Sequence, residues 1–298
     1  MKRNKMYQMV LTSAFAAIIL VLSLVPQIGY ITILPGVSIT LVHIVVLVGV
    51  FSLGLKGGVI LGLFFGIGGT LAALMRGNTP FDQAFVYPWV SVIPRMLFAA
   101  AAYYFSVGFK KILKVKYGKV IVITLVSMIS GLALFFGTNS IVKNATKDPY
   151  NKLVMQIAEL KKNETENKEK IDQLNLELPV LDEKTNNDYK KITNITQPIV
   201  IVITVLVIGI YVFYTFKNKK YDISVPSVMI LGTLAHTVLV LLSVYIFSPQ
   251  AFTQTFGDSQ STISIIYGVA MANGLVEALA AVVIGTPIVY ALEQVKEK

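Results

Sequence analysis

The chain has 298 residues, of which 55% are hydrophobic and 14% are charged, and its mean hydropathy is +0.69. Those values lie outside the range of soluble domains, and the lack of cysteine excludes disulfides, thiolate catalysis and cysteine metal sites. The formal net charge of +10 does not indicate nucleic-acid binding, because the basic residues form no patch with interleaved aromatic side chains.

Eight apolar stretches are each long enough to cross a bilayer, whose hydrocarbon core of roughly 30 Å needs about 20 helical residues. We expect spans near 7–25, 38–55, 58–75, 87–108, 120–142, 198–216, 225–248 and 263–290. The first stretch has a basic flank, as a signal peptide would, but no small-residue cleavage site follows it. We therefore expect it to remain as a membrane helix.

The lysines and arginines of the short loops are concentrated on one side of the predicted membrane. Five lysines lie between Lys110 and Lys119, whereas the short loops 26–37, 76–86 and 249–262 together hold only Arg76. Cytoplasmic loops of membrane proteins carry such an excess of positive charge. The pattern predicts a multi-pass protein of the cell membrane with both termini in the cytoplasm, where its cations would face anionic lipid headgroups.

A long polar segment, 143–197, separates the fifth span from the sixth and contains ten lysines and ten acidic residues. The positive-inside rule discounts long loops, so these lysines are compatible with an extracytoplasmic location. Apolar residues follow a heptad spacing at Leu153, Ile157, Leu160, Ile171, Leu174, Leu178 and Leu181. We expect a helix from about Pro149 to Leu178 that Pro179 ends. Its apolar stripe needs a partner, which is the return segment 181–195, a second copy or another protein.

Small residues repeat every four positions in three spans, where they let helix backbones approach closely. Gly58, Gly62 and Gly66 form one such face in the third span, and Ser13 and Ala17 supply a shorter one in the first. The last span has Ala270, Gly274 and Ala278 in the same spacing. Tight packing within a helix bundle is the plain interpretation of all three.

The strongest polar side chains inside the spans are expected in the outer half or at the midplane of the membrane. They are His43, Arg95, His236, Asn273 and Glu277. Ionisable groups at such depths are costly unless they face a cavity or one another. Arg95 and Glu277 either pair within the bundle, or Arg95 faces an outward cavity and binds an anionic or carbonyl group. The two histidines and Asn273 either pack within the bundle or contact a ligand.

The outer loop 76–86 is rich in turn residues and runs into Tyr87, Pro88 and Trp89. Asn78 and Asp82 lie in this loop. Two interpretations stay open, because the segment has the composition of a lid over a pocket and its aromatic residues also suit a belt at the membrane interface.

Several of these segments resemble the substrate-binding S components of energy-coupling factor (ECF) vitamin transporters. The similarity covers roughly 1–110 and 222–298. It is carried by the segments Leu34-Pro-Gly with 39–44, the glycine-rich third span, 85–95, 232–240 and 273–278 followed by Pro287.

This resemblance implies an all-α integral membrane protein that captures a vitamin or vitamin precursor from outside. It also implies an ECF transmembrane coupling subunit and ABC-type ATPases as partners, since the chain has no phosphate-binding glycine loop of its own. Small residues of the first helix contact the coupling subunit in that family, here Ser13 and Ala17. No cofactor is expected. The substrate-binding residues that we expect are His43, Asn78, Asp82, Tyr87, Trp89, Arg95, His236, Asn273 and Glu277.

The chain departs from the family pattern at 118–221. We expect a six-helix S-component-like bundle made of 1–117 and 222–298, with two additional transmembrane helices and an extracytoplasmic helical hairpin inserted at 118–221. An even number of added crossings leaves every later helix in its family orientation.

Two other classes of function remain open from the sequence. An ion-coupled secondary transporter acting alone would normally show an inverted repeat, and none is seen. A membrane-anchored interaction protein would use the outer heptad segment. An enzyme is not expected, because the spans hold no paired carboxylates and no clustered histidines.

Overall fold

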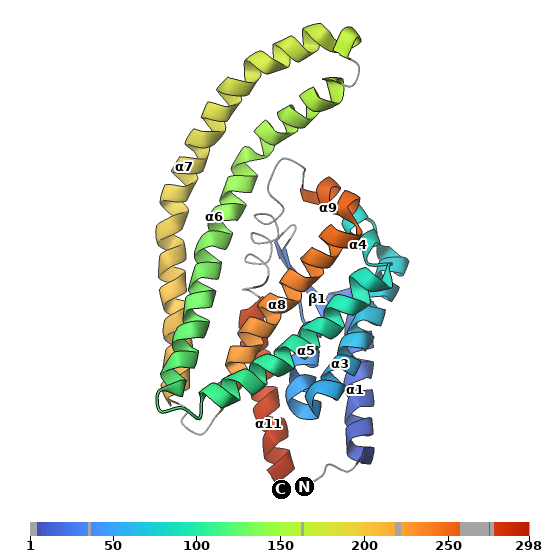
Figure 1. Ribbon diagram of the computed structural model, residues 1–298, viewed down its shortest axis with the longest axis vertical. Coiled ribbons are helices and arrows are strands. Elements are labelled where there is room, and N and C mark those ends of the chain that lie inside the picture. The colour runs from blue at the N-terminus through green and yellow to red at the C-terminus, as the bar shows by residue number, and fades with distance from the viewer. Residues whose placement is uncertain are drawn as a thin grey trace.

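The computed structural model describes residues 5–34, 37–161, 164–217, 222–256, 274 and 277–297. These form a helical bundle with a long two-helix arm along one side (Figure 1). The start of α1 and the end of α11 lie at one end of the bundle, which we call the inner end, and α4 and α9 lie at the other, outer end. The arm continues past the outer end.

Within the described residues, six helices are long and apolar enough to cross a membrane. They are α1 (Lys5–Leu24), α3 (Val42–Arg76), α5 (Pro88–Ile112), the part Gly118–Asn139 of α6 (Gly118–Leu160), α8 (Ser224–Phe247) and Glu277–Val295, which includes the π-helical turn η2 (Ala281–Gly285) and α11 (Thr286–Glu297). Helices suit a bilayer because they satisfy backbone hydrogen bonds internally. The all-α membrane class is thus confirmed. The predicted span 198–216 lies within α7 (Glu164–Lys217), which is not among the six, and its crossing stays a prediction.

Helix α3 covers most of two predicted spans, 38–55 and 58–75, and its helical geometry is interrupted at Gly54, near the boundary between them. This glycine has φ 74° and ψ −165°, a conformation that side-chain-bearing residues rarely adopt. Beyond it the chain folds back, so a methyl group placed on Gly58 would meet Val50 and one on Gly49 would meet Leu61. The turn lies near the inner end, where Lys110 contacts the ring of Phe51.

A small β-hairpin precedes α3, where no strands were expected from the sequence. Strand β1 (Tyr30–Leu34) pairs antiparallel with β2 (Val37–Thr40), and Tyr30 is opposite Thr40. The short helix α2 (Pro26–Gly29) leads into it. The predicted span 38–55 was therefore wrong at its start, since 38–40 is strand. Alternating β-branched residues on either side of a Pro-Gly pair favour a hairpin over a helix.

The core of the bundle lies between α1, α3, α5, α8 and the last helix. Its largest fully buried side chains include Ile19, Leu47, Phe98 and Met229. Helix α5 approaches α3 closely, because a methyl group on Gly62 would lie 2.5 Å from the carbonyl oxygen of Arg95. The glycine face therefore determines the position of the helix that carries Arg95.

The arm consists of α6 and α7, which run side by side (Figure 1). All seven residues of the predicted heptad stripe lie in one hydrophobic cluster: Leu153, Ile157, Leu160, Ile171, Leu174, Leu178 and Leu181. The expectation of one helix from Pro149 to Leu178 was wrong, because α6 ends at Leu160 and α7 begins at Glu164. The two halves of the stripe pack on each other across this break. Helix α7 continues through Pro179, where Leu178 and Leu181 of the same cluster flank the proline.

The lower part of the arm lies against the bundle. The hydroxyl of Tyr211 on α7 is 2.8 Å from that of Ser227 on α8. Within the arm, Gly131 of α6 faces Thr204 and Ile208 of α7. The 21 residues of α6 beyond Asn139 correspond to a length on the order of 30 Å. The arm therefore reaches well beyond the outer end of the bundle.

Candidate functional site

Three of the predicted site residues converge inside the bundle from helices far apart in sequence. His43 of α3 and His236 of α8 stack with ring centroids 5.6 Å apart and planes at 10°. Phe65 lies 5.3 Å from the ring of His236 and 5.7 Å from Cζ of Arg95 on α5. All three polar side chains are buried. We call them, together with Phe65, the polar cluster.

The two histidines of this cluster have hydrophobic surroundings. Phe98 lies edge-on to His236 with centroids 5.0 Å apart. Neither ring nitrogen of His236 has a hydrogen-bond partner among the described residues, whereas the His43 ring lies near the backbone of Thr40. A buried donor or acceptor without a partner costs about 1–3 kcal/mol. Such groups in a membrane bundle call for a functional explanation, and a ligand that supplies the missing partners is one.

Arg95 donates a hydrogen bond to a backbone carbonyl that has no helical partner because of a proline. Pro94 cannot donate a backbone hydrogen bond, so the carbonyl of Val90, four residues earlier, loses its helical partner. Arg95 Nη1 donates to this carbonyl at 2.8 Å and Ser243 Oγ donates to it at 3.1 Å. The guanidinium also lies 4.8 Å from the ring centroid of Phe85. Pro94 thus explains the orientation of the side chain that follows it.

Glu277 contacts the backbone rather than a basic side chain. Its Oε1 accepts a hydrogen bond of 2.8 Å from the N–H of Thr40, at the end of β2. Among the described residues, no ion pair joins Glu277 to Arg95, so the pairing considered from the sequence is not observed. The turn η2 follows Glu277, and Pro287 explains its wider geometry, because its ring would clash with the carbonyl of Val283 in a regular helix.

The outer loop forms the short helix α4 (Pro80–Ala84), and its polar residues serve that helix. Thr79 and Asp82 form a capping box, in which the Thr79 N–H donates to the Asp82 carboxylate at 3.3 Å and the Asp82 N–H donates to Thr79 Oγ1 at 3.1 Å. Asn78 is exposed. Tyr87 and Trp89 stack on each other with centroids 5.3 Å apart and are about half exposed. This placement is typical of an interfacial aromatic belt.

The remaining predictions fall on the first and last helices. Ser13 and Ala17 are exposed on one face of α1. Asn273 lies outside the described residues. The structure therefore brings His43, Arg95 and His236 together, ties Glu277 to the chain three residues before His43, and leaves Tyr87 and Trp89 at the surface.

The aromatic members of the site were missed from the sequence. Phe65 and Phe98 occur in apolar stretches where a phenylalanine facing lipid has the same pattern. Phe85 precedes the belt residues and carries no signal of its own. Phe65 did have one indication, since it is next to Gly66 on the helix whose glycine face packs against α5.

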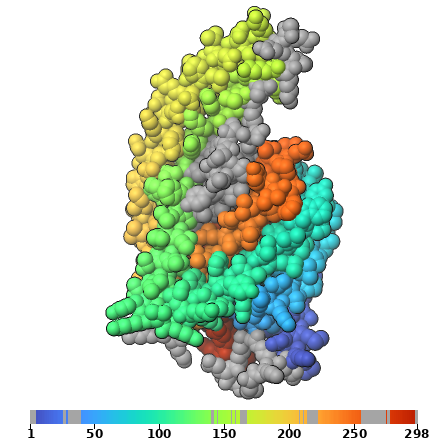
Figure 2. Space-filling model, in the orientation of Figure 1, coloured from blue at the N-terminus to red at the C-terminus, as the bar shows by residue number. Residues whose placement is uncertain are grey.

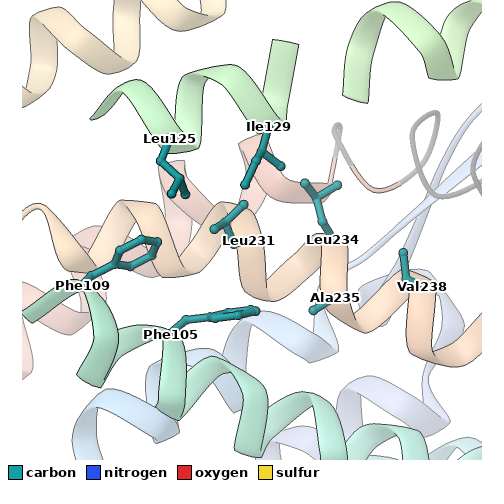
Figure 3. Close-up of a pocket in the computed structure, with 8 residues that line it drawn as sticks. All are labelled: Phe105, Phe109, Leu125, Ile129, Leu231, Leu234, Ala235 and Val238. Atoms are coloured by element: carbon teal, nitrogen blue, oxygen red, sulfur yellow. The ribbon is translucent and has the colours of Figure 1, made fainter. Parts of the chain in front are cut away.

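A cavity of about 440 Å³ that is largely open to the surface lies elsewhere, between α5, α6 and α8 (Figure 3). None of the predicted site residues lines it. Its eight lining side chains are all hydrophobic, so it differs in chemistry from the polar cluster.

Comparison with known families gives a match. Residues 7–154 match the family model described as "ECF transporter, substrate-specific component". The matched range runs from α1 through α5 and includes most of α6, so it extends into the segment 118–221 that the sequence resemblance left out. It contains His43, Phe65 and Arg95 but not His236. No curated protein matches the chain.

Proposed function

Because the chain belongs to the substrate-specific components of ECF transporters, we propose that it captures a vitamin or vitamin precursor at the outer face of the membrane. It then delivers this substrate together with an ECF transmembrane coupling subunit and ABC-type ATPases. The chain supplies binding and selectivity in this scheme, and the ATPases supply the energy.

The observation that carries this proposal is the convergence of His43, Arg95 and His236 on Phe65. Two buried imidazoles and one guanidinium offer donors and acceptors, and the aromatic rings offer a flat apolar surface. A planar ligand that bears a carboxylate or several carbonyl groups matches both properties. In the proposal, Asn273 and Glu277 complete the site from the last helix.

The outer loop controls access to this site in our proposal. Asn78 and Asp82 lie in the loop before α5, and Tyr87 and Trp89 lie at the start of that helix. The same segment contains Phe85, whose ring contacts the guanidinium of Arg95. A displacement of the loop would therefore change the surroundings of Arg95 directly.

The exposed face of α1 is the proposed contact for the coupling subunit. Ser13 and Ala17 are exposed there, and the larger side chains of Met6, Val10 and Val21 on the same helix are more than half exposed. Small residues that interrupt such an apolar face let a partner helix approach closely. Bound in this way, the partner would cover α1 and leave the polar cluster untouched.

The arrangement in the membrane follows from the same proposal. Segments 1–117 and 222–298 form the binding bundle, and 118–221 adds two transmembrane helices and the extracytoplasmic arm. Both termini lie in the cytoplasm. The alternative of a membrane-anchored interaction protein is less well supported, because the heptad stripe packs within the arm and is not free to bind another protein.

Two measurements test the proposal. Mass spectrometry of the small molecules that co-purify with the detergent-solubilised chain identifies the substrate, and uptake by cells with and without coupling subunits tests the transport class. Uptake that persists without any coupling subunit would instead favour an ion-coupled carrier acting alone.

Substitution of Arg95 tests the site. We expect Arg95→Ala to weaken binding of the co-purified molecule by about tenfold or more, because a buried ligand group loses a charged partner. Arg95→Lys keeps the charge but not the planar fork, and should recover only part of this loss. Arg76→Ala is the matched control, since Arg76 donates to the carbonyls of Ser23 and Leu24 at the end of α1. Normal affinity in folded Arg95→Ala would refute the proposed site.

A further inference from the structure

The apolar cavity between α5, α6 and α8 has a lining suited to hydrocarbon. Its walls are formed by Phe105, Phe109, Leu125, Ile129, Leu231, Leu234, Ala235 and Val238, whose side chains border the same space (Figure 3). Water in such a cavity would find no hydrogen-bonding partner among these side chains. Because all three helices are candidate membrane spans, the hydrocarbon available to fill the cavity is that of lipid acyl chains.

The cavity begins at the depth of the inner leaflet. Leu125 is seven residues from the start of α6, and Val238 is fourteen residues from the start of α8, which correspond to about 10 and 21 Å along the helices. Both helices start at the inner end. Given a hydrocarbon core of roughly 30 Å, whose midplane is about 15 Å from the inner end, the cavity begins in the inner half of the membrane and extends past the midplane.

A cluster of lysines lies at the inner end of this cavity. Phe109 lines the cavity and directly precedes Lys110 and Lys111, and the connection from α5 to α6 adds Lys114 and Lys116. Figure 2 shows this connection, in green, projecting from the bundle at the lower left. Lys110 is 3.8 Å from Asp222, whereas Lys111, Lys114 and Lys116 are exposed.

The charge around these lysines is uniformly positive along the chain. There is no acidic residue between Asp82 and Asp148. Basic groups at the cytoplasmic ends of transmembrane helices attract anionic headgroups and select them over zwitterionic ones. The position of the lysines next to an apolar cavity therefore matches the two parts of an anionic phospholipid.

We infer that this place binds an anionic phospholipid of the inner leaflet, with one acyl chain in the cavity and the phosphate at Lys111, Lys114 and Lys116. The lipid fills the space between α6 and the bundle, and so supports the contact between the added helices and α8. The site is separate from the polar cluster and does not depend on the proposed function. It depends on the orientation that the lysine distribution predicts.

Photolabelling in lipid nanodiscs tests this inference with the full chain. The discs contain either phosphatidylglycerol or phosphatidylcholine with the same photoactivatable acyl chain, and labelled peptides are identified by mass spectrometry. Peptides that include 105–109, 125–129 and 231–238 should be labelled several-fold more by the phosphatidylglycerol. Ala235→Phe, which fills the cavity, should reduce this labelling, whereas Ala14→Phe on the exposed face of α1 should not.

The lysines are tested by a pair of charge-matched variants. Replacement of Lys111, Lys114 and Lys116 by glutamine should abolish the preference for phosphatidylglycerol but keep acyl-chain labelling. Replacement of Lys168, Lys170 and Lys184, which are exposed on the arm, removes the same charge and should keep the preference. Both sets of lysines lie on the surface, so neither replacement should unfold the protein. Equal labelling by the two lipids, or labelling that Ala235→Phe leaves unchanged, would overturn the inference.

Discussion

Glu277 accepts a hydrogen bond of 2.8 Å from the backbone N–H of Thr40, which ties the last membrane helix to the chain three residues before His43. Glu277 is only 5% exposed, whereas Thr40 is partly buried. The contact thus joins the last helix to the entrance of α3 and positions the start of the helix that carries one stacked histidine.

We expect Glu277→Ala to weaken binding of the co-purified molecule and to lower thermal stability, because it leaves the Thr40 N–H without its acceptor, at a cost of about 1–3 kcal/mol. Glu277→Gln retains a carbonyl oxygen for that bond and should preserve most of the stability. Thermal unfolding in detergent measures the stability, and retention of the molecule through gel filtration measures the binding. Equal stability of the two variants would show that the hydrogen bond is unimportant.

Substitution of His236 separates binding from stability. His236→Phe keeps a flat ring against Phe65 and Phe98 but removes two buried nitrogens that have no partner among the described residues. Because unpartnered buried groups are destabilising, the variant should unfold at the same temperature or higher. Its retention of the co-purified molecule should fall about tenfold, the effect of losing roughly 1.4 kcal/mol of binding free energy. Loss of stability with unchanged retention would assign His236 to packing alone.

Much of the fold could be predicted because its signals are local. Hydropathy located spans in each of the six helices that can cross a membrane, and the heptad spacing identified the seven residues that form the core of the arm. The spacing could not show where the chain turns, since Leu160 and Ile171 keep the same register in one long helix and in two helices that pack on each other. The physical signal for the turn is the contact between the two halves, and that contact is not local.

The polar members of the candidate site were predictable from the sequence, and its aromatic members were not. Arg95, His43 and His236 stand out because polar groups in a membrane span are rare. Their neighbours do not, because Phe65 and Phe98 resemble lipid-facing residues. The partner of Glu277 was missed for a different reason: it is the backbone N–H of Thr40, and a backbone group has no signature in the sequence.

The glycine face of α3 should be sensitive to a single added methyl group. Gly62→Ala places a methyl 2.5 Å from the carbonyl oxygen of Arg95, so α5 must shift, and we expect a loss of about 1–3 kcal/mol in stability together with weaker binding. Gly108→Ala on α5 is the matched control, because nothing lies within 4 Å of its added methyl. Thermal unfolding of both variants checks this. A Gly62→Ala protein as stable as Gly108→Ala would mean that α5 tolerates displacement.

The capping box of α4 distinguishes two roles of the outer loop. If Asp82 acts only through the cap, Thr79→Ala and Asp82→Ala should have the same effect, a loss of about 0.5–2 kcal/mol in stability. If Asp82 also gates the site, Asp82→Ala should change the association rate of the identified ligand and Thr79→Ala should not. Stopped-flow binding and thermal unfolding measure the two effects. Identical association rates in both variants would remove Asp82 from the proposed gate.

The arm should open without loss of ligand binding when its core is disrupted. Ile157 is 6% exposed and packs among the heptad residues, so Ile157→Asp buries a charge without a partner and should separate α6 from α7 in this region. Trypsin would then cut more rapidly at the exposed lysines near the tip, such as Lys161, Lys168 and Lys170. Leu176→Asp is the control on the same arm, because Leu176 is 75% exposed and its replacement disturbs no packing. Binding of the co-purified molecule should be the same in both variants, since the polar cluster lies inside the bundle. If Ile157→Asp abolished binding in a folded bundle, the arm would have to belong to the substrate site.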